Sequence, residues 1–206
     1  DIADAGDPAR LYYWRKAHKA AWRTPPIEIV RLRHRAAEQL GLSYRDYTAI
    51  LLDRGRRPDA IFFALEGTLI RSIGNGLDVT GHDRMLLMPG VRKKLQRLTG
   101  CAIFIVAGQP DATSFVRAGA ECTIREVGEL CGIAIADVST WCEGGAGQRA
   151  STLDAVNHLL TKHRLVPSQT VFVGTTAADE KAAEAAGLAR FLWAWHYFAE
   201  GPAGTS

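Results

Sequence analysis

Three turns in this sequence carry residue types that could hold a phosphate or move a proton. Each turn follows an apolar segment, after Leu65, Val106 and Val173. Glu66 supplies a titratable carboxylate, and the backbone N–H groups of the glycine-containing turns could cradle a phosphate. The residues concerned are Glu66, Gly67 and Thr68, then Gly108 and Gln109, and finally Thr175 and Asp179.

The same residues could instead have purely structural roles. Gly67-Thr68 also suits a tight turn that leads into a helix, and Glu66 also suits a solvated loop. Asp179 also suits the first turn of a helix, where a negative charge is favourable. The glycine-rich segment 144–147 has the composition of a flexible loop, because no Lys-Ser or Lys-Thr follows it as in a nucleotide-binding loop.

The elements that must position these turns alternate between strands and helices. The predicted strands are residues 60–65, 101–108 and 170–175, and the predicted helices are residues 91–98, 151–163 and 179–188. The last helix is expected to stop at Gly187. This alternation predicts an α/β fold with a doubly wound parallel sheet, in which ligands bind at the carboxyl ends of the strands.

The first 57 residues differ from the rest in charge. Residues 10–57 carry 12 Lys and Arg against 4 Asp and Glu, whereas the rest of the chain is net negative and the whole has a charge of +3. Helices are predicted over residues 11–23, 27–40 and 44–52, with a linker at 54–58. We therefore predict a basic helical module over 1–57 and an α/β domain over 58–206.

The amino-terminal module has the pattern of Ala37, Gly41, Tyr47 and Ile50, which is similar to a helix-turn-helix. Three uses stay open: sequence-specific groove binding, phosphate binding by a basic face, and a solvated or protein-contacting appendage. The candidate nucleic-acid-binding residues are Arg15, Lys16, Lys19, Arg23, Arg31, Arg35, Arg45, Arg54, Arg56 and Arg57. An oligomer is compatible with all three uses.

Composition excludes several other classes. No apolar run approaches the ~18 residues that a membrane span needs. The amino-terminal sequence lacks the charged and apolar regions of a signal peptide, and the four widely spaced cysteines do not form a zinc-binding pattern. We expect a cytoplasmic protein without a membrane partner.

From residue 58 onward the sequence resembles the haloacid dehalogenase-like (HAD) superfamily, in its histidinol-phosphatase and polynucleotide 3′-phosphatase branch. FFALEGTLI (62–70) is similar to the first motif, Asp-x-Asp-Gly-Thr-Leu. MPGVRKKLQRLTGCAIFIVAGQP (88–110) resembles the second, and VFVGTTAADEKAAEAAGL (171–188) resembles the fourth. The aromatic FLWAWHYF (191–198) is similar to a strand end in the polynucleotide members. The segments between motifs are too short for a large cap, so the resemblance implies an uncapped phosphatase fold.

The resemblance also identifies the catalytic groups that this chain lacks. The family's nucleophilic Asp corresponds to Ala64, and a methyl group cannot attack phosphorus. The acid–base Asp corresponds to Glu66, which is longer by one methylene. The metal-binding Asp of the fourth motif corresponds to Thr175.

The phosphate-binding groups are also altered. The hydroxyl of the second motif corresponds to Ala107, and the third-motif Lys is best matched by Arg149, with Lys162 further along. The phosphate-binding candidates are Gly67, Thr68, Gly108, Gln109 and Arg149. Only Glu66 and Asp179 remain as weak metal candidates, so Mg²⁺ is expected to bind weakly if at all, and no other cofactor is expected.

These departures favour a catalytically degenerate HAD-like domain, a pseudo-phosphatase that binds a nucleic acid or a protein. Two alternatives remain. One is an active Mg²⁺-dependent HAD phosphatase, acting on polynucleotides or small phosphates, whose nucleophile is altered in this sequence. The other is a structural subunit of a larger assembly.

Overall fold

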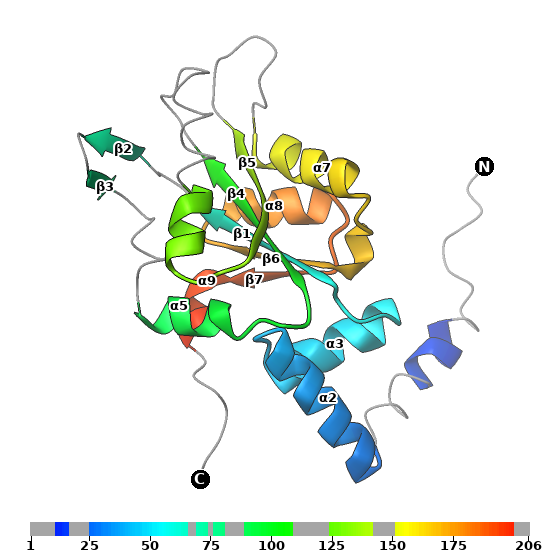
Figure 1. Ribbon diagram of the computed structural model, residues 1–206. Coiled ribbons are helices and arrows are strands. Elements are labelled where there is room, and N and C mark those ends of the chain that lie inside the picture. The colour runs from blue at the N-terminus through cyan, green and yellow to red at the C-terminus, as the bar shows by residue number, and fades with distance from the viewer. Residues whose placement is uncertain are drawn as a thin grey trace, which may run out of the picture.

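The computed structural model describes residues 11–16, 25–65, 69–73, 76–80, 89–108, 124–141 and 151–199. Its centre is a five-stranded parallel sheet in the order β5-β4-β1-β6-β7 (Figure 1). The strands are β1 (Ala60–Leu65), β4 (Ala102–Gly108), β5 (Ile135–Trp141), β6 (Thr170–Gly174) and β7 (Arg190–Trp193). The predicted α/β class with a parallel sheet is therefore confirmed.

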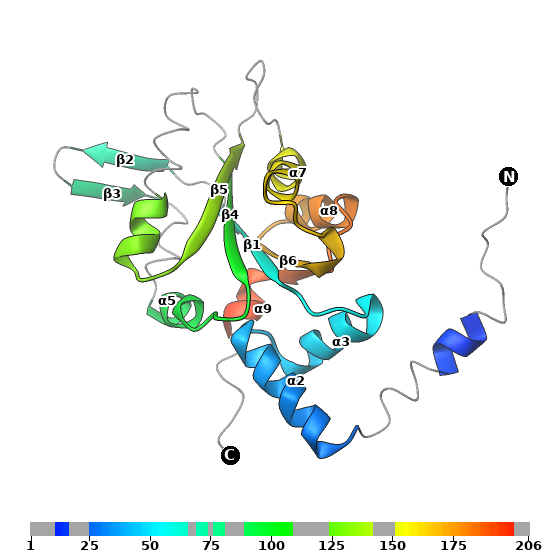
Figure 2. The same ribbon diagram turned by 45° about the vertical axis from the view of Figure 1, so that its right-hand side comes forward.

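Helices cover both faces of the sheet (Figures 1 and 2). On one face, α7 (Thr152–His163) and α8 (Ala177–Ala185) pack against apolar residues of β1, β4 and β6. On the other, α5 (Pro89–Gln96), a helix at 124–130 and α9 (Ala194–Ala199) pack against the alternate residues of the same strands. Burial on both faces explains why these strands read as continuous apolar runs.

A β-hairpin separates β1 from α5. Its strands, β2 (Leu69–Ile73) and β3 (Gly76–Thr80), are antiparallel, and Ile73 pairs with Gly76. The sequence analysis did not predict this hairpin, although a Gly-Asn dipeptide, which the sequence has at positions 74–75, is typical of two-residue hairpin turns. It also did not predict β5. This strand contains the buried polar residues Asp137, Ser139 and Thr140, so it lacks the continuous apolar run that marks the other buried strands.

The amino-terminal helices α2 (Ile27–Gln39) and α3 (Tyr44–Arg54) meet at a tight turn. Gly41 in this turn has a φ of 61°, and the side chain of Ser43 accepts the N–H of Asp46 as the predicted N-cap. A Cβ at residue 41 would lie 2.6 Å from the hydroxyl of Tyr197. Glycine is therefore required both by the backbone conformation and by the approach of α9.

Both helices contribute to the hydrophobic core of the sheet. Leu40, Tyr47 and Ile50 are buried in the same cluster as β1 and β4. The buried hydroxyl of Tyr197 on α9 donates a 3.2 Å hydrogen bond to the carbonyl of Leu40. The module boundary between residues 57 and 58 stays a prediction, and residues on both sides of it share one core. No helix among the described residues has the length and apolar character needed to cross a membrane.

Candidate functional site

The carboxyl ends of β1, β4 and β6 lie side by side at the centre of the sheet. Ala64 on β1 is 3% exposed and packs with the α7 and α8 cluster. Ala107 on β4 is fully buried and packs in the cluster on the opposite face. The structure thus brings the two strand ends together but directs the two methyl groups to different faces. Neither residue offers a nucleophile or a hydrogen-bond donor in its side chain.

Gly108 is the last residue of β4, and the indole ring of Trp141 lies next to it. A Cβ at residue 108 would lie 2.9 Å from the indole of Trp141 at the end of β5. The ring therefore lies against the backbone where the predicted phosphate-binding turn begins. Any larger residue at position 108 would displace Trp141 from the sheet edge. Gln109, the other candidate of this turn, lies outside the described residues, as do Glu66, Gly67, Thr68 and Arg149.

Thr175 and Asp179 lie where β6 leads into α8. Thr175 is exposed and Asp179 is fully buried. The Oδ2 atom of Asp179 accepts the backbone N–H groups of Thr175 at 3.0 Å and Thr176 at 3.1 Å. Thr176 in turn accepts the N–H of Asp179, which completes a capping box. Asp179 thus holds together the turn after β6 and the start of α8. This agrees with its predicted place in the first turn of a helix.

The described residues of this edge do not fit a magnesium ion. A hard dication prefers several oxygen ligands, including carboxylates. Ala64 has no ligand atom, and one carboxylate oxygen of Asp179 already accepts two N–H groups. Within the described part of the chain, no three or more His, Cys, Asp and Glu side chains gather as a metal site would require.

Two of the four cysteines belong to the described residues. Cys131 is buried, and Cys101 is half-buried. Burial raises the pKa of the Cys101 thiol to about 12, against the opposing effect of the Arg57 charge. Because the thiolate is the reactive form, Cys101 is a poor nucleophile at neutral pH.

The candidate nucleic-acid residues have different surroundings. Arg15 and Lys16 are exposed on a helical segment at 11–16, and Arg45 and Arg56 are also exposed, whereas Lys19 and Arg23 lie outside the described residues. Arg31 and Arg35 are exposed on α2 together with Glu28 and Glu38. Side chains three or four apart on a helix are neighbours, so carboxylates interrupt the basic face predicted for α2.

Two other candidate arginines bind the protein's own backbone. Arg54 donates a 3.0 Å hydrogen bond to the carbonyl of Leu188, and Arg57 donates one of 3.0 Å to the carbonyl of Gly100. Each contact ties the end of the amino-terminal part to a loop of the sheet domain. These two guanidinium groups therefore have a structural role that the sequence pattern did not indicate.

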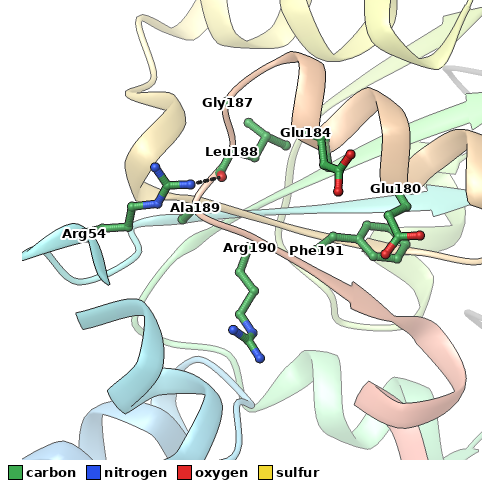
Figure 3. A pocket seen from close by; sticks show the side chains of 9 residues that line it. Arg54, Glu180, Glu184, Gly187, Leu188, Ala189, Arg190 and Phe191 are labelled. Atoms are coloured by element: carbon green, nitrogen blue, oxygen red, sulfur yellow. Dashed lines mark hydrogen bonds between the residues drawn. The ribbon is translucent and has the colours of Figure 1, made fainter. Parts of the chain in front are cut away.

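A pocket of about 410 Å³ lies between α3, α8 and the start of β7 (Figure 3). Arg54 reaches across it to Leu188, and Glu180 and Glu184 lie along its α8 side. Arg190 pairs instead with Asp46 of α3, with 3.1 Å between Nη2 and Oδ1. Because this pocket adjoins the amino end of β7, it is distinct from the strand ends that the sequence predicts as a site.

Sequence reasoning missed a charged cluster around Asp137 on the edge strand β5. Lys162 and His163 of α7 approach Oδ2 at 2.6 and 2.7 Å, and Arg125 pairs with Oδ1. Burial disfavours the charged carboxylate, but the hydrogen bonds from Lys162 and His163 outweigh it and hold the pKa of Asp137 well below its usual range. A register shift between β4 and β5 just before Asp137 marks this position as irregular.

Fold and geometry together define an α/β protein whose five-stranded parallel sheet is flanked by helices on both faces. No family model matches the chain, and no curated protein matches it. Among solved structures it is similar to the crystal structure of a hypothetical protein from Xanthomonas campestris, with 21% identity and a TM-score of 0.38. That match covers 68% of this chain and 66% of the other.

Proposed function

We propose that this chain is a catalytically degenerate HAD-like domain, which binds a phosphate-bearing macromolecule without hydrolysing it. The segments that resemble the first, second and fourth HAD motifs contain residues of β1, β4 and β6, respectively. These are the three central strands of the sheet, with β1 between the other two. The arrangement supports the proposal, because motifs that cooperate in one site must end at the same edge.

Ala64 is the observation that carries the proposal. It occupies the end of the central strand, where the resemblance places the nucleophile, and its methyl group is buried among apolar side chains. Covalent phosphoryl transfer needs an oxygen, sulfur or nitrogen nucleophile at that point. No rotation of an alanine side chain can supply one.

Asp179 provides the second support. It is the one carboxylate that the described residues retain from the fourth motif, and its Oδ2 atom is bonded to the backbone of Thr175 and Thr176. A carboxylate that holds a turn together is poorly placed to move toward an added substrate or ion. Thr175 itself has a neutral side chain in place of the second anionic ligand.

A nucleic acid is the partner that the charge distribution favours. Exposed cations occur in the segment 11–16, at the start of α3 and in the linker, and include Arg15, Arg45 and Arg56. Such cations attract phosphates with little sequence preference. A protein partner is the alternative, and it would show as binding that is insensitive to salt and to oligonucleotide competition.

A phosphate-release assay tests the loss of catalysis. The purified chain is incubated with Mg²⁺ and either p-nitrophenyl phosphate or a 3′-phosphorylated oligonucleotide, and inorganic phosphate is measured. We expect release at the rate of the buffer control. The double variant Ala64→Asp, Thr175→Asp is measured beside it to show whether the two carboxylates alone restore turnover. Many Mg²⁺-dependent turnovers by the unaltered chain would refute the proposal.

A further inference from the structure

The helical segment 11–16, drawn in dark blue in Figure 1, exposes consecutive large apolar side chains. Tyr12 is 60% exposed and Tyr13 is 66% exposed, and their neighbours Leu11 and Trp14 are exposed as well. The other exposed large apolar side chains among the described residues are not consecutive in the sequence. A contiguous exposed apolar patch is typical of a surface that contacts another molecule.

The same segment carries cations and lacks carboxylates. Arg15 and Lys16 directly follow the aromatic residues, and both are exposed. The sequence between Asp7 and Glu28 contains five Lys and Arg and no Asp or Glu. On α2, in contrast, Glu28 and Glu38 accompany the exposed arginines. The charge of the segment 11–16 therefore complements a polyanion.

Helical spacing places Tyr12 beside both cations. At 3.6 residues per turn, Arg15 lies about 60° to one side of Tyr12 around the helix axis, and Lys16 lies about 40° to the other side. Side chains three and four residues apart on a helix are neighbours, with about 5–6 Å between their Cβ atoms. One arc of this helix therefore presents an aromatic ring between two cations.

The aromatic rings of the segment are not confined to one face of the helix. Tyr13 follows Tyr12 at about 100° around the axis, and Trp14 follows at about 200°. The rings of Tyr12 and Tyr13 contact each other edge-on, with 5.6 Å between their centroids. A helix that lies on a membrane gathers its apolar side chains on the face opposite its cations. An aromatic ring between two cations suits instead a ligand that alternates anionic groups with flat apolar ones, as a nucleic-acid strand does.

We propose that the segment 11–16 binds single-stranded nucleic acid, with phosphates at Arg15 and Lys16 and bases stacked on Tyr12 and Tyr13. Cations beside exposed aromatic rings bind a single strand with little sequence preference, because every base has a face that can stack. A duplex hides the faces of its bases and can use the cations alone. This inference rests on the proposed binding function, to which it adds the form of the nucleic acid and the residues that bind it.

Fluorescence anisotropy with fluorescein-labelled dT12 tests the stacking. The variant Tyr12→Ala, Tyr13→Ala is compared with the unaltered chain. The matched control is Trp195→Ala, which removes an exposed aromatic ring from α9. We expect the double variant to lose about tenfold or more in affinity and the control to lose less than about threefold. Affinity for a 12-base-pair duplex should change by less than about twofold, and Tyr12→Phe, Tyr13→Phe, which keeps both rings, should retain most of the affinity for dT12.

Neutralising the two cations tests the phosphate contacts. Arg15→Gln, Lys16→Gln should weaken the binding of dT12 and of the duplex alike. For dT12, the slope of log affinity against log salt should become shallower by about 1.4, since each single-strand phosphate contact contributes about 0.7. The matched control is Arg31→Gln, Arg35→Gln on α2, which also removes two exposed arginines and should change the affinity by less than about threefold. Circular dichroism and thermal unfolding check that each variant is folded.

Three outcomes would overturn the inference. Equal affinity of Tyr12→Ala, Tyr13→Ala and the unaltered chain for dT12 would exclude stacking on these rings. A loss confined to the α2 control would move the binding site to that helix. Co-sedimentation with vesicles of phosphatidylcholine and phosphatidylserine, in a chain that does not bind dT12, would make a membrane surface the partner of this segment.

These results also separate the inference from the proposed function. If the unaltered chain binds dT12 and no variant in the segment 11–16 weakens that binding, the inference fails and nucleic-acid binding stands. If the unaltered chain binds neither dT12 nor the duplex, nucleic acid is excluded as the partner. The phosphate-release assay tests the loss of catalysis independently of both results.

Discussion

Thr176 and Asp179 hold each other in place at the start of α8 by two reciprocal hydrogen bonds. The hydroxyl of Thr176 accepts the N–H of Asp179 at 3.2 Å, and the carboxylate of Asp179 accepts the N–H of Thr176 at 3.1 Å. The same carboxylate oxygen also accepts the N–H of Thr175. The Oδ2 atom of Asp179 thus joins a strand to a helix, whereas its Oδ1 atom is buried without a hydrogen-bond partner among the described residues.

Replacing Asp179 with alanine should destabilise the fold. The backbone N–H groups of Thr175 and Thr176 lose their acceptor in this turn, which costs about 2 kcal/mol in the free energy of unfolding. Urea unfolding followed by circular dichroism measures this change. Glu184→Gln, at an exposed position of the same helix, is the control and should change stability by less than about 0.5 kcal/mol. Equal stability of Asp179→Ala and the unaltered chain would remove the structural role assigned here.

Gly174 must remain without a side chain for the same turn to form. A Cβ there would lie 2.6 Å from the Cβ of Asp179 and 2.6 Å from the ring of Phe191. Gly174→Ala should therefore cost about 2 to 3 kcal/mol, because the packed core must shift. Gly90→Ala is the matched control, since a Cβ at that helical position meets nothing within 4 Å. It should be neutral or stabilising by up to about 1 kcal/mol. Similar effects of the two substitutions would show that crowding at Gly174 is not limiting.

The Asp137 cluster predicts a specific loss of stability in acid. The pKa of Asp137 is lower in the folded chain than in the unfolded chain, so the unfolded state binds more protons as the pH falls. The stabilisation is complete above the ordinary aspartate pKa of about 4 and is lost as the pH falls below it toward the depressed folded value. Urea unfolding at several values between pH 7 and pH 3 measures this dependence.

Asp137→Asn isolates the contribution of that carboxylate. The variant should be less stable at pH 7 by about 2 kcal/mol, because Arg125, Lys162 and His163 lose a charged acceptor. The difference from the unaltered chain should narrow toward pH 3. A difference that stays constant over this range would mean that Asp137 does not titrate as proposed.

Ile50 tests whether the amino-terminal helices unfold with the sheet. Its side chain is 1% exposed and belongs to the cluster that β1 and β4 also form. Ile50→Ala should cost about 3 kcal/mol and leave a single transition that has the same midpoint by circular dichroism and by tryptophan fluorescence. Leu32→Ala, at an exposed position of α2, is the control and should have little effect. Two separate transitions in the unaltered chain would instead support two independent modules.

Local patterns predicted much of this fold. The apolar runs at 60–65 and 101–108 became β1 and β4 with little change in their bounds, because a strand buried on both faces needs apolar residues throughout. Ser43 as an N-cap and Gly187, with a φ of 68°, beyond the end of α8 also follow from the sequence, since caps depend on neighbouring residues.

The candidate site was less predictable. From the sequence, Arg54 and Arg57 were predicted to bind nucleic acid. In the structure, Arg54 donates to the carbonyl of Leu188 and Arg57 donates to the carbonyl of Gly100, both distant in the chain. It also gave no sign that Trp195 is exposed while Tyr197, two residues later, is buried. Both facts depend on which elements lie against α3 and α9.

By itself, the sequence determined that residue 64 carries a methyl group, which can be neither a nucleophile nor a ligand, because a side chain's chemistry does not depend on its surroundings. Only the tertiary structure decided the roles of the charged residues. A carboxylate or guanidinium can bind a ligand, solvent or its own backbone, and the choice is made by groups that folding brings within 3 Å. Asp179 and Arg54 bind backbone groups of the protein itself, whereas Arg92 and Lys93 are exposed to solvent.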